Sequence, residues 1–176
     1  GSPGLARRRE LAANGRGLEA LGFRRVGDDN GRGGVVAPPG AVIIAVGDAL
    51  HDLPADFGED ATLFVVLGQT LADAGRNAHF ALPITSFAEQ EGTFTNHEGR
   101  VQRFWPALRP PQLARPAWQV LGVLLAGLDD APAPADAASA FLRIGQLYDE
   151  FSGLSYATLG TRGALINEPV RLTGGE

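Results

Sequence analysis

Two largely apolar runs constrain the fold more than any other feature of this sequence. Residues 41–46 read Ala-Val-Ile-Ile-Ala-Val, and residues 60–68 read Asp-Ala-Thr-Leu-Phe-Val-Val-Leu-Gly. A strand with one face in water alternates apolar and polar residues, and these runs do not alternate. We therefore expect two strands that are buried on both faces, as in a parallel sheet.

A crossover and a third strand follow along the chain. Gln69–Asn77 is compatible with a helix, and Phe80–Leu82 is a short apolar stretch that Pro83 stops. Strand, helix and strand at this spacing predict a right-handed βαβ unit.

The loops after the first two strands are the places where an open α/β sheet binds ligands. They contain Gly47-Asp48 and Gly68-Gln69, and Asp48 and His51 could therefore face a site. A turn aspartate and a surface histidine are the favoured interpretation of these two side chains.

A β-hairpin is predicted after the third strand. Segments 92–96 and 100–104 alternate in polarity, and His97-Glu-Gly99 joins them with a glycine that supplies the positive φ of the turn. Three apolar residues of this hairpin do not all share one face: Phe94, Val101 and Phe104.

Two helices are predicted after a Pro-rich connector at 106–116. They cover 117–128 and 137–151, with an Ala/Pro linker at 129–135 between them. Their apolar stripes, which we expect to pack on the α/β core, are Trp118, Leu121, Leu125 and Leu128 in the first helix, and Phe141, Ile144, Leu147 or Tyr148, and Phe151 in the second.

The sequence of the N-terminal part predicts two short helices followed by a loop. Leu5–Ala13 suits an amphipathic helix, and Asn14–Gly22 suits a glycine turn that leads into a second one, with Gly15 and Gly17 as turn residues rather than a phosphate loop. Gly27–Gly40 has no periodicity and is expected to be a loop.

Together these elements predict an α/β fold with a partial parallel sheet, flanking helices, a β-hairpin and a helical C-terminal appendage. The expected division is an α/β domain over residues 1–105, the connector over 106–116, a helical segment over 117–160, with a turn near its end, and a loose tail over 161–176.

Composition removes several classes of function. The sequence has no cysteine, which excludes disulfides and clusters held by thiolates, and its net charge of −5 argues against a nucleic-acid partner. No apolar run approaches the roughly 20 residues of a membrane span, so we expect a soluble chain. It also has no methionine, so it is expected to be a piece of a longer protein.

The sequence offers few groups for catalysis. Its three histidines do not pair at the spacing of a zinc site, and no nucleophile elbow is present. Glu89, Glu91 and Glu98 would allow an acid/base pair, but caps or partners of Arg100 are favoured. From these residues alone the chain is an α/β domain of unknown function.

Residues 81–102 carry the most specific order in the chain: Ala-Leu-Pro at 81–83, Ser-Phe-Ala-Glu at 86–89, Glu-Gly-Thr-Phe-Thr-Asn at 91–96 and Glu-Gly-Arg-Val-Gln at 98–102. This order resembles the end of the molybdopterin oxidoreductase fold, in the form found in the G subunit, the large iron–sulfur subunit, of NADH:quinone oxidoreductase (respiratory complex I). The stretches at 115–121 and 153–160 are also similar to that protein. The resemblance implies structural roles for nine motif residues: Pro83, Glu89, Gly92, Thr93, Asn96, Glu98, Gly99, Arg100 and Gln102.

One position separates the branches of the family. Catalytic formate dehydrogenases usually have Arg where this chain has Gly99, so the resemblance points to the complex I branch, which keeps the fold without a working molybdenum site. The helical pattern after Gln102, in place of a pterin-gripping β-barrel, agrees with that branch.

The resemblance implies a non-catalytic scaffold in the C-terminal part of the large iron–sulfur subunit. It implies no catalytic, cofactor-binding or metal residue on this chain, with iron–sulfur clusters and flavin elsewhere in the parent complex. The implied partners are other parts of the peripheral arm, on the cytoplasmic side of the inner membrane, without direct membrane insertion. Two alternatives stay open: a pterin-side fragment of a formate dehydrogenase-like enzyme, and a free-standing α/β module that binds a small molecule.

Overall fold

The computed structural model describes residues 14–24, 36–47, 51, 53–71, 73–111, 113–129 and 132–167. Two compact units alternate along the chain. We call residues 25–91 and 105–134 the parallel-sheet unit, and residues 1–24, 92–104 and 135–176 the hairpin unit. The structure thus groups the segments differently from the expected division by chain order, because each unit combines segments that are distant in the sequence.

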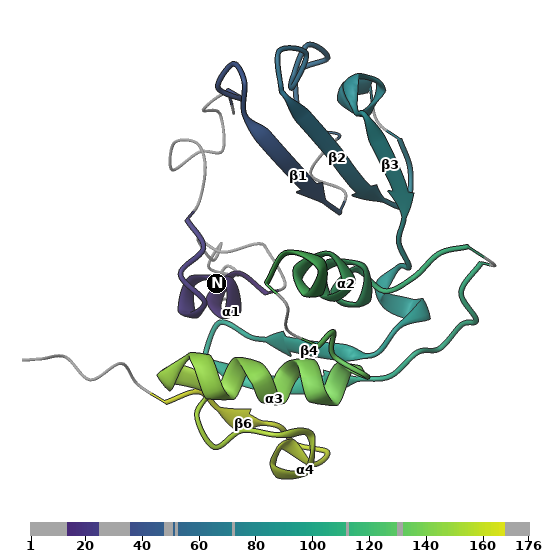
Figure 1. Ribbon diagram of the computed structural model, residues 1–176. Coiled ribbons are helices and arrows are strands. Elements are labelled where there is room, and N and C mark those ends of the chain that lie inside the picture. The colour runs from purple at the N-terminus through teal and green to yellow at the C-terminus, as the bar shows by residue number, and fades with distance from the viewer. Residues whose placement is uncertain are drawn as a thin grey trace, which may run out of the picture. The chain divides into compact units, whose positions relative to one another are not determined.

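The parallel-sheet unit contains the three predicted strands (Figure 1): β1 at Val42–Val46, β2 at Leu63–Gly68 and β3 at Phe80–Pro83. All pairs are parallel, and β2 lies in the middle of the sheet. The predicted parallel sheet is therefore confirmed.

Burial differs between the two apolar runs. Phe64 and Leu67 in the central strand β2 are fully buried, as predicted. In β1, however, Val42, Ile44 and Val46 are exposed, by 67% in the case of Val42. The prediction that β1 is buried on both faces is wrong, because β1 is an edge strand and these three residues lie on a face that its own unit leaves open in the described residues.

The two faces of β2 pack on different segments. On one face Phe64 and Val66 pack against Phe57, with the two rings edge to face. On the other face Val65 and Leu67 form a core with helix α2, which spans Ala117–Asp129. The predicted helix is confirmed.

The stripe by which α2 packs differs from the prediction. Its packed residues are Ala117, Val120 and Leu121, whereas Leu125 is half exposed and Leu128 is 85% exposed. Of the predicted stripe only Leu121 is among the residues packed in this core, since the sheet lies beneath the first half of the helix alone.

The helix in the crossover between β2 and β3 is shorter than predicted. The crossover contains the 3₁₀ helix η2, at Asp73–Asn77, rather than a helix over 69–77. His79 then joins the two strands, because its Nδ1 accepts the Phe64 N–H (3.0 Å) and its own N–H donates to the Phe64 carbonyl (2.8 Å). After β3 comes a second 3₁₀ turn, η3, at Phe87–Glu89.

The hairpin unit is built on an antiparallel sheet (Figure 1). β4, at Gly92–Thr95, pairs with β5, at Arg100–Phe104, and β5 pairs with β6, at Ala164–Leu165. The predicted hairpin is confirmed, and Phe94 and Phe104 stack on one face while Val101 lies on the other. The prediction of a loose tail from residue 161 is wrong for β6.

The helices of this unit cover the Val101 face. α3 spans Ala137–Leu147, η4 spans Asp149–Phe151 and α4 spans Tyr156–Leu159. Phe141, Phe151 and Leu159 form a core with Val101. Of the helix predicted over 137–151, α3 covers 137–147 and η4 follows it, and Phe141, Ile144 and Phe151 of the predicted stripe pack on the hairpin sheet.

The first described helix, α1 at Gly15–Ala20, contains both glycines that were expected to form a turn. That expectation is wrong, and close packing explains Gly17: a Cβ there would lie 2.6 Å from Asn14 Oδ1 and 2.8 Å from Thr95 Oγ1.

Some predictions fall outside the described residues: the helix over 5–13, the part of the loop over 27–35, Asp48, and the tail beyond residue 167. Within the part of the chain that the structure describes, no helix has both the length and the apolar character needed to cross a bilayer.

Candidate functional site

The motif residues are divided between the two units. Pro83 and Glu89 belong to the parallel-sheet unit, and Gly92 to Gln102 belong to the hairpin unit. Each group is therefore described within its own unit.

β3 ends at Pro83, but the chain remains extended beyond it. Its carbonyl accepts the Arg115 N–H (3.3 Å), and the next residue, Ile84, donates to the Gly68 carbonyl (3.1 Å) and forms a bridge with Arg115. Proline has no N–H to donate to a neighbouring strand, so it suits an edge strand such as β3. Pro83 thus links β3 to the segment that leads into α2.

Glu89 caps the turn in which it lies. Its Oε2 accepts the Ser86 N–H (2.8 Å), while its own N–H donates to the Ser86 carbonyl (3.1 Å). This is a capping box, in which the carboxylate satisfies a backbone donor at the start of η3. The carboxylate of Glu89 is committed to the backbone.

Asn96 organises the hairpin turn, a role that the sequence analysis did not assign to it. Its Oδ1 accepts the N–H groups of Glu98 (3.0 Å) and Arg100 (2.9 Å), and its carbonyl accepts the Gly99 N–H (2.9 Å). Gly99 has φ +80°, as the predicted turn requires. The available signal was the preference of asparagine for turns, where its side chain bonds to the backbone two residues on.

The charged residues of the turn do not pair as expected. Glu98 lies 3.7 Å from His97 Nε2, and Arg100 Nη1 donates to the Gly163 carbonyl (3.4 Å). The favoured pairing of Glu98 with Arg100 is therefore wrong, because the Arg100 side chain extends to the segment before β6 instead.

The remaining motif residues lie in the strands. Gly92 has the Phe104 ring where a Cβ would be, at 2.8 Å. Thr93 stands opposite Arg103, and Gln102 stands opposite Phe94. All three residues lie in the paired strands β4 and β5.

Arg103 and Tyr156 make a contact that sequence reasoning missed. The Arg103 guanidinium carbon lies 4.4 Å from the centre of the Tyr156 ring, a cation–π geometry that ties β5 to α4. No local signal could have found it, since 52 intervening residues separate the two positions and only folding brings them together.

The carboxyl edge of the parallel sheet is the place predicted for a ligand. His51, after β1, hydrogen-bonds through Nε2 to Thr70 Oγ1, after β2 (2.9 Å). The structure therefore brings the two predicted loops together. A small hollow of about 190 Å³ lies beside them, with Gly68, Gln69 and Thr70 in its lining.

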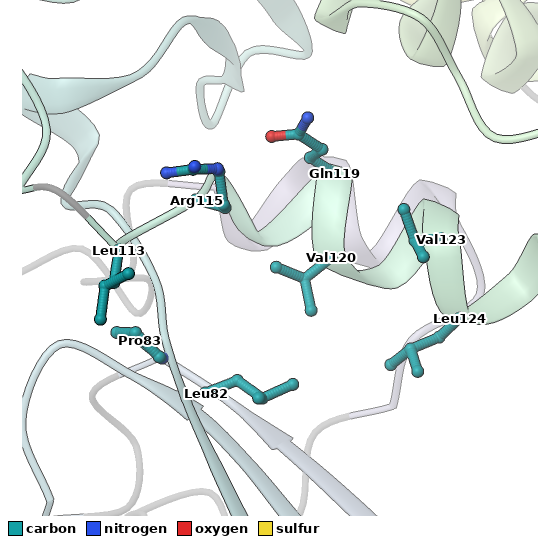
Figure 2. A pocket seen from close by; sticks show the side chains of 8 residues that line it. All are labelled: Leu82, Pro83, Leu113, Arg115, Gln119, Val120, Val123 and Leu124. Carbon is teal, nitrogen blue, oxygen red and sulfur yellow. The ribbon is translucent and has the colours of Figure 1, made fainter.

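A larger groove lies elsewhere in the same unit, between β3 and α2 (Figure 2). Its volume is about 440 Å³, and apolar side chains from both elements line most of it. The sequence analysis did not anticipate it.

Asp136, the N-cap of α3, has a carboxyl whose pKa is lowered below its usual value. The causes are hydrogen bonds from the backbone and then from the side chain of Ser139. Among the described residues no group of three or more His, Asp or Glu is placed to hold a metal ion.

Comparison with known proteins finds a matching family model and several relatives. The sequence model of the molybdopterin oxidoreductase family matches residues 47–126. The G subunit of the NADH-quinone oxidoreductase of Pseudomonas fluorescens is 29% identical over 180 aligned residues, which cover 92% of this chain and 20% of the relative.

Two further relatives match a shorter part of the chain. The alpha subunit of an F420-dependent formate dehydrogenase of Methanococcus maripaludis is 32% identical over 102 residues, covering 57% of this chain and 15% of the relative. The 78 kDa subunit of mitochondrial NADH-ubiquinone oxidoreductase of Candida albicans is 36% identical over 93 residues, covering 52% and 13%. The chain spans a fifth or less of the length of these relatives. Residues 47–126 of the chain are thus similar to the molybdopterin oxidoreductase family, and the Pseudomonas fluorescens G subunit is among the relatives of the chain.

Proposed function

We propose that this chain is a non-catalytic scaffold portion of the large iron–sulfur subunit of an NADH-quinone oxidoreductase. The observation that carries the proposal is the extent of similarity. The match with the Pseudomonas fluorescens G subunit covers 92% of the chain, whereas the match with the Methanococcus maripaludis formate dehydrogenase covers 57%. A match over 92% necessarily includes segments of both compact units.

The chemistry of the motif residues supports a structural role. The Glu89 carboxylate caps η3, the Asn96 side chain holds the hairpin turn, and the Arg100 guanidinium bonds a backbone carbonyl. A catalytic acid, base or anion-binding group must instead reach a substrate. These three side chains are engaged with the protein itself.

The described residues at the carboxyl edge of the sheet support the proposal that this chain holds no pterin cofactor. A molybdopterin carries phosphate, which proteins bind with arginine, lysine or clustered backbone N–H groups. The hollow there is about 190 Å³, below the roughly 300 Å³ at which small-molecule sites begin, and its described lining has no cationic side chain. In our proposal the iron–sulfur clusters and flavin of the parent complex are bound outside this chain.

The proposed setting is the peripheral arm of a membrane-associated complex, on the cytoplasmic side of the inner membrane, with other parts of that arm as partners. The complex as a whole would pass electrons from NADH to quinone. This chain would act as a scaffold that stabilises the neighbouring parts of the arm. The relatives from Pseudomonas fluorescens and Candida albicans, both named as parts of NADH-oxidising quinone or ubiquinone oxidoreductases, support that setting.

A chimera tests the proposal. The matching fifth of the Pseudomonas fluorescens G subunit would be replaced with this chain in cells that make the complex. We expect an assembled complex on native gels and NADH:quinone activity close to that of the parent. Loss of assembly, while the chimeric protein is still made and folded, would contradict the proposal.

The second candidate function is a fragment of a formate dehydrogenase-like molybdopterin enzyme, which the 32% identity to the Methanococcus maripaludis protein favours. Absorption spectra and metal analysis distinguish the two. Visible absorption from a bound pterin, or molybdenum in a one-to-one ratio with the purified parent protein, would favour the enzyme. A colourless chain whose parent contains iron without molybdenum would favour the scaffold.

A further inference from the structure

We draw no further inference here: the strongest candidate, the open apolar groove between β3 and α2 (Figure 2), carries none, because nothing in the described part of the chain shows what covers it.

Discussion

The Asn14 side chain accepts the backbone N–H of Thr95 across 81 positions of sequence, with Oδ1 and N 2.8 Å apart. Asn14 stands at the N-cap of α1, yet its side chain makes no cap bond to that helix. Its oxygen instead satisfies a donor of β4, where Thr95 is 4% exposed. This bond and the close approach of Gly17 to Thr95 attach α1 to the hairpin sheet.

Asn14→Ala should lower the free energy of unfolding by about 1–3 kcal/mol, because it leaves a buried N–H without an acceptor. Urea unfolding measures this change. Asn14→Asp keeps an oxygen in the same place and should lose much less. A further control is Arg16→Ala, which removes only an exposed contact with Glu19 at 4.0 Å and should change stability by less than about 0.5 kcal/mol. Equal losses for Asn14→Ala and Asn14→Asp would contradict the assignment.

His79 should be replaceable by asparagine but not by leucine. Its Nδ1 accepts the Phe64 N–H, which places the proton of the neutral ring on Nε2. Asparagine Oδ1 can accept the same bond, so His79→Asn should retain most of the stability, whereas His79→Leu should lose about 1–2 kcal/mol. Hydrogen exchange at the Phe64 amide reads the bond directly. Its protection should fall in His79→Leu alone, and equal protection in both variants would show that the ring nitrogen is not the acceptor that matters.

The strands, the hairpin and the two long helices could be predicted because each depends on a local pattern. The run over 60–68 and the alternation on either side of Gly99 contain the information for β2 and for the hairpin. β6 could not be predicted, because Ala164–Leu165 is too short to show a period.

Burial could not be predicted from apolar character alone. Residues 41–46 and 63–67 are similarly apolar, yet β2 is central and β1 is an edge strand. Likewise Leu121 and Leu128 belong to one helix, but only Leu121 has the sheet beneath it. A sequence pattern identifies an apolar face and does not say which segment covers it.

In the candidate site, too, the local features could be predicted from the sequence and the tertiary contacts could not. The spacing of Ser86 and Glu89 is that of a capping box, and Gly99 takes the positive φ that its turn requires. Gly99 therefore has a sufficient local reason to be glycine, apart from what it implies about the branch of the family. The contacts of Arg100 with Gly163 and of Arg103 with Tyr156 depend on tertiary folding, and no spacing in the sequence announces them.

Asp136 gives a pH-dependent contribution of known sign. The Ser139 backbone N–H, and then its side chain, lower the pKa of the Asp136 carboxyl in the folded state. A carboxyl with a depressed folded pKa adds stability above its unfolded pKa and loses it as pH falls through the folded pKa. Between neutral pH and strongly acidic pH, Asp136→Asn should therefore show a shallower loss of stability than the parent.

Carbon-13 NMR titration of the Asp136 carboxyl checks the cause. Ser139→Ala removes the side-chain hydrogen bond but keeps the backbone N–H, so the pKa of Asp136 should rise and still remain below that of an unstructured peptide. A pKa that is unchanged in Ser139→Ala would show that the side chain of Ser139 has no part in the shift.

Gly163→Ala should be among the most damaging single-methyl changes in the hairpin unit. Gly163 has φ +72°, and a Cβ there would lie 2.2 Å from the Val101 carbonyl oxygen, which belongs to the backbone and has little freedom to move. Gly153 is the matched control, because its φ is +79° but no atom lies within 4 Å of the added Cβ. Gly153→Ala should cost only the strain of a positive φ, about 1–2 kcal/mol, and Gly163→Ala should cost about 1–3 kcal/mol more. Because the clash is with β5 where β6 pairs, Gly163→Ala should also weaken the protection of the Ile166 amide, which donates to the Gly99 carbonyl. Equal losses in the two variants, measured by urea unfolding, would mean that backbone strain alone acts at both positions and that the approach of Gly163 to Val101 is looser than the structure describes.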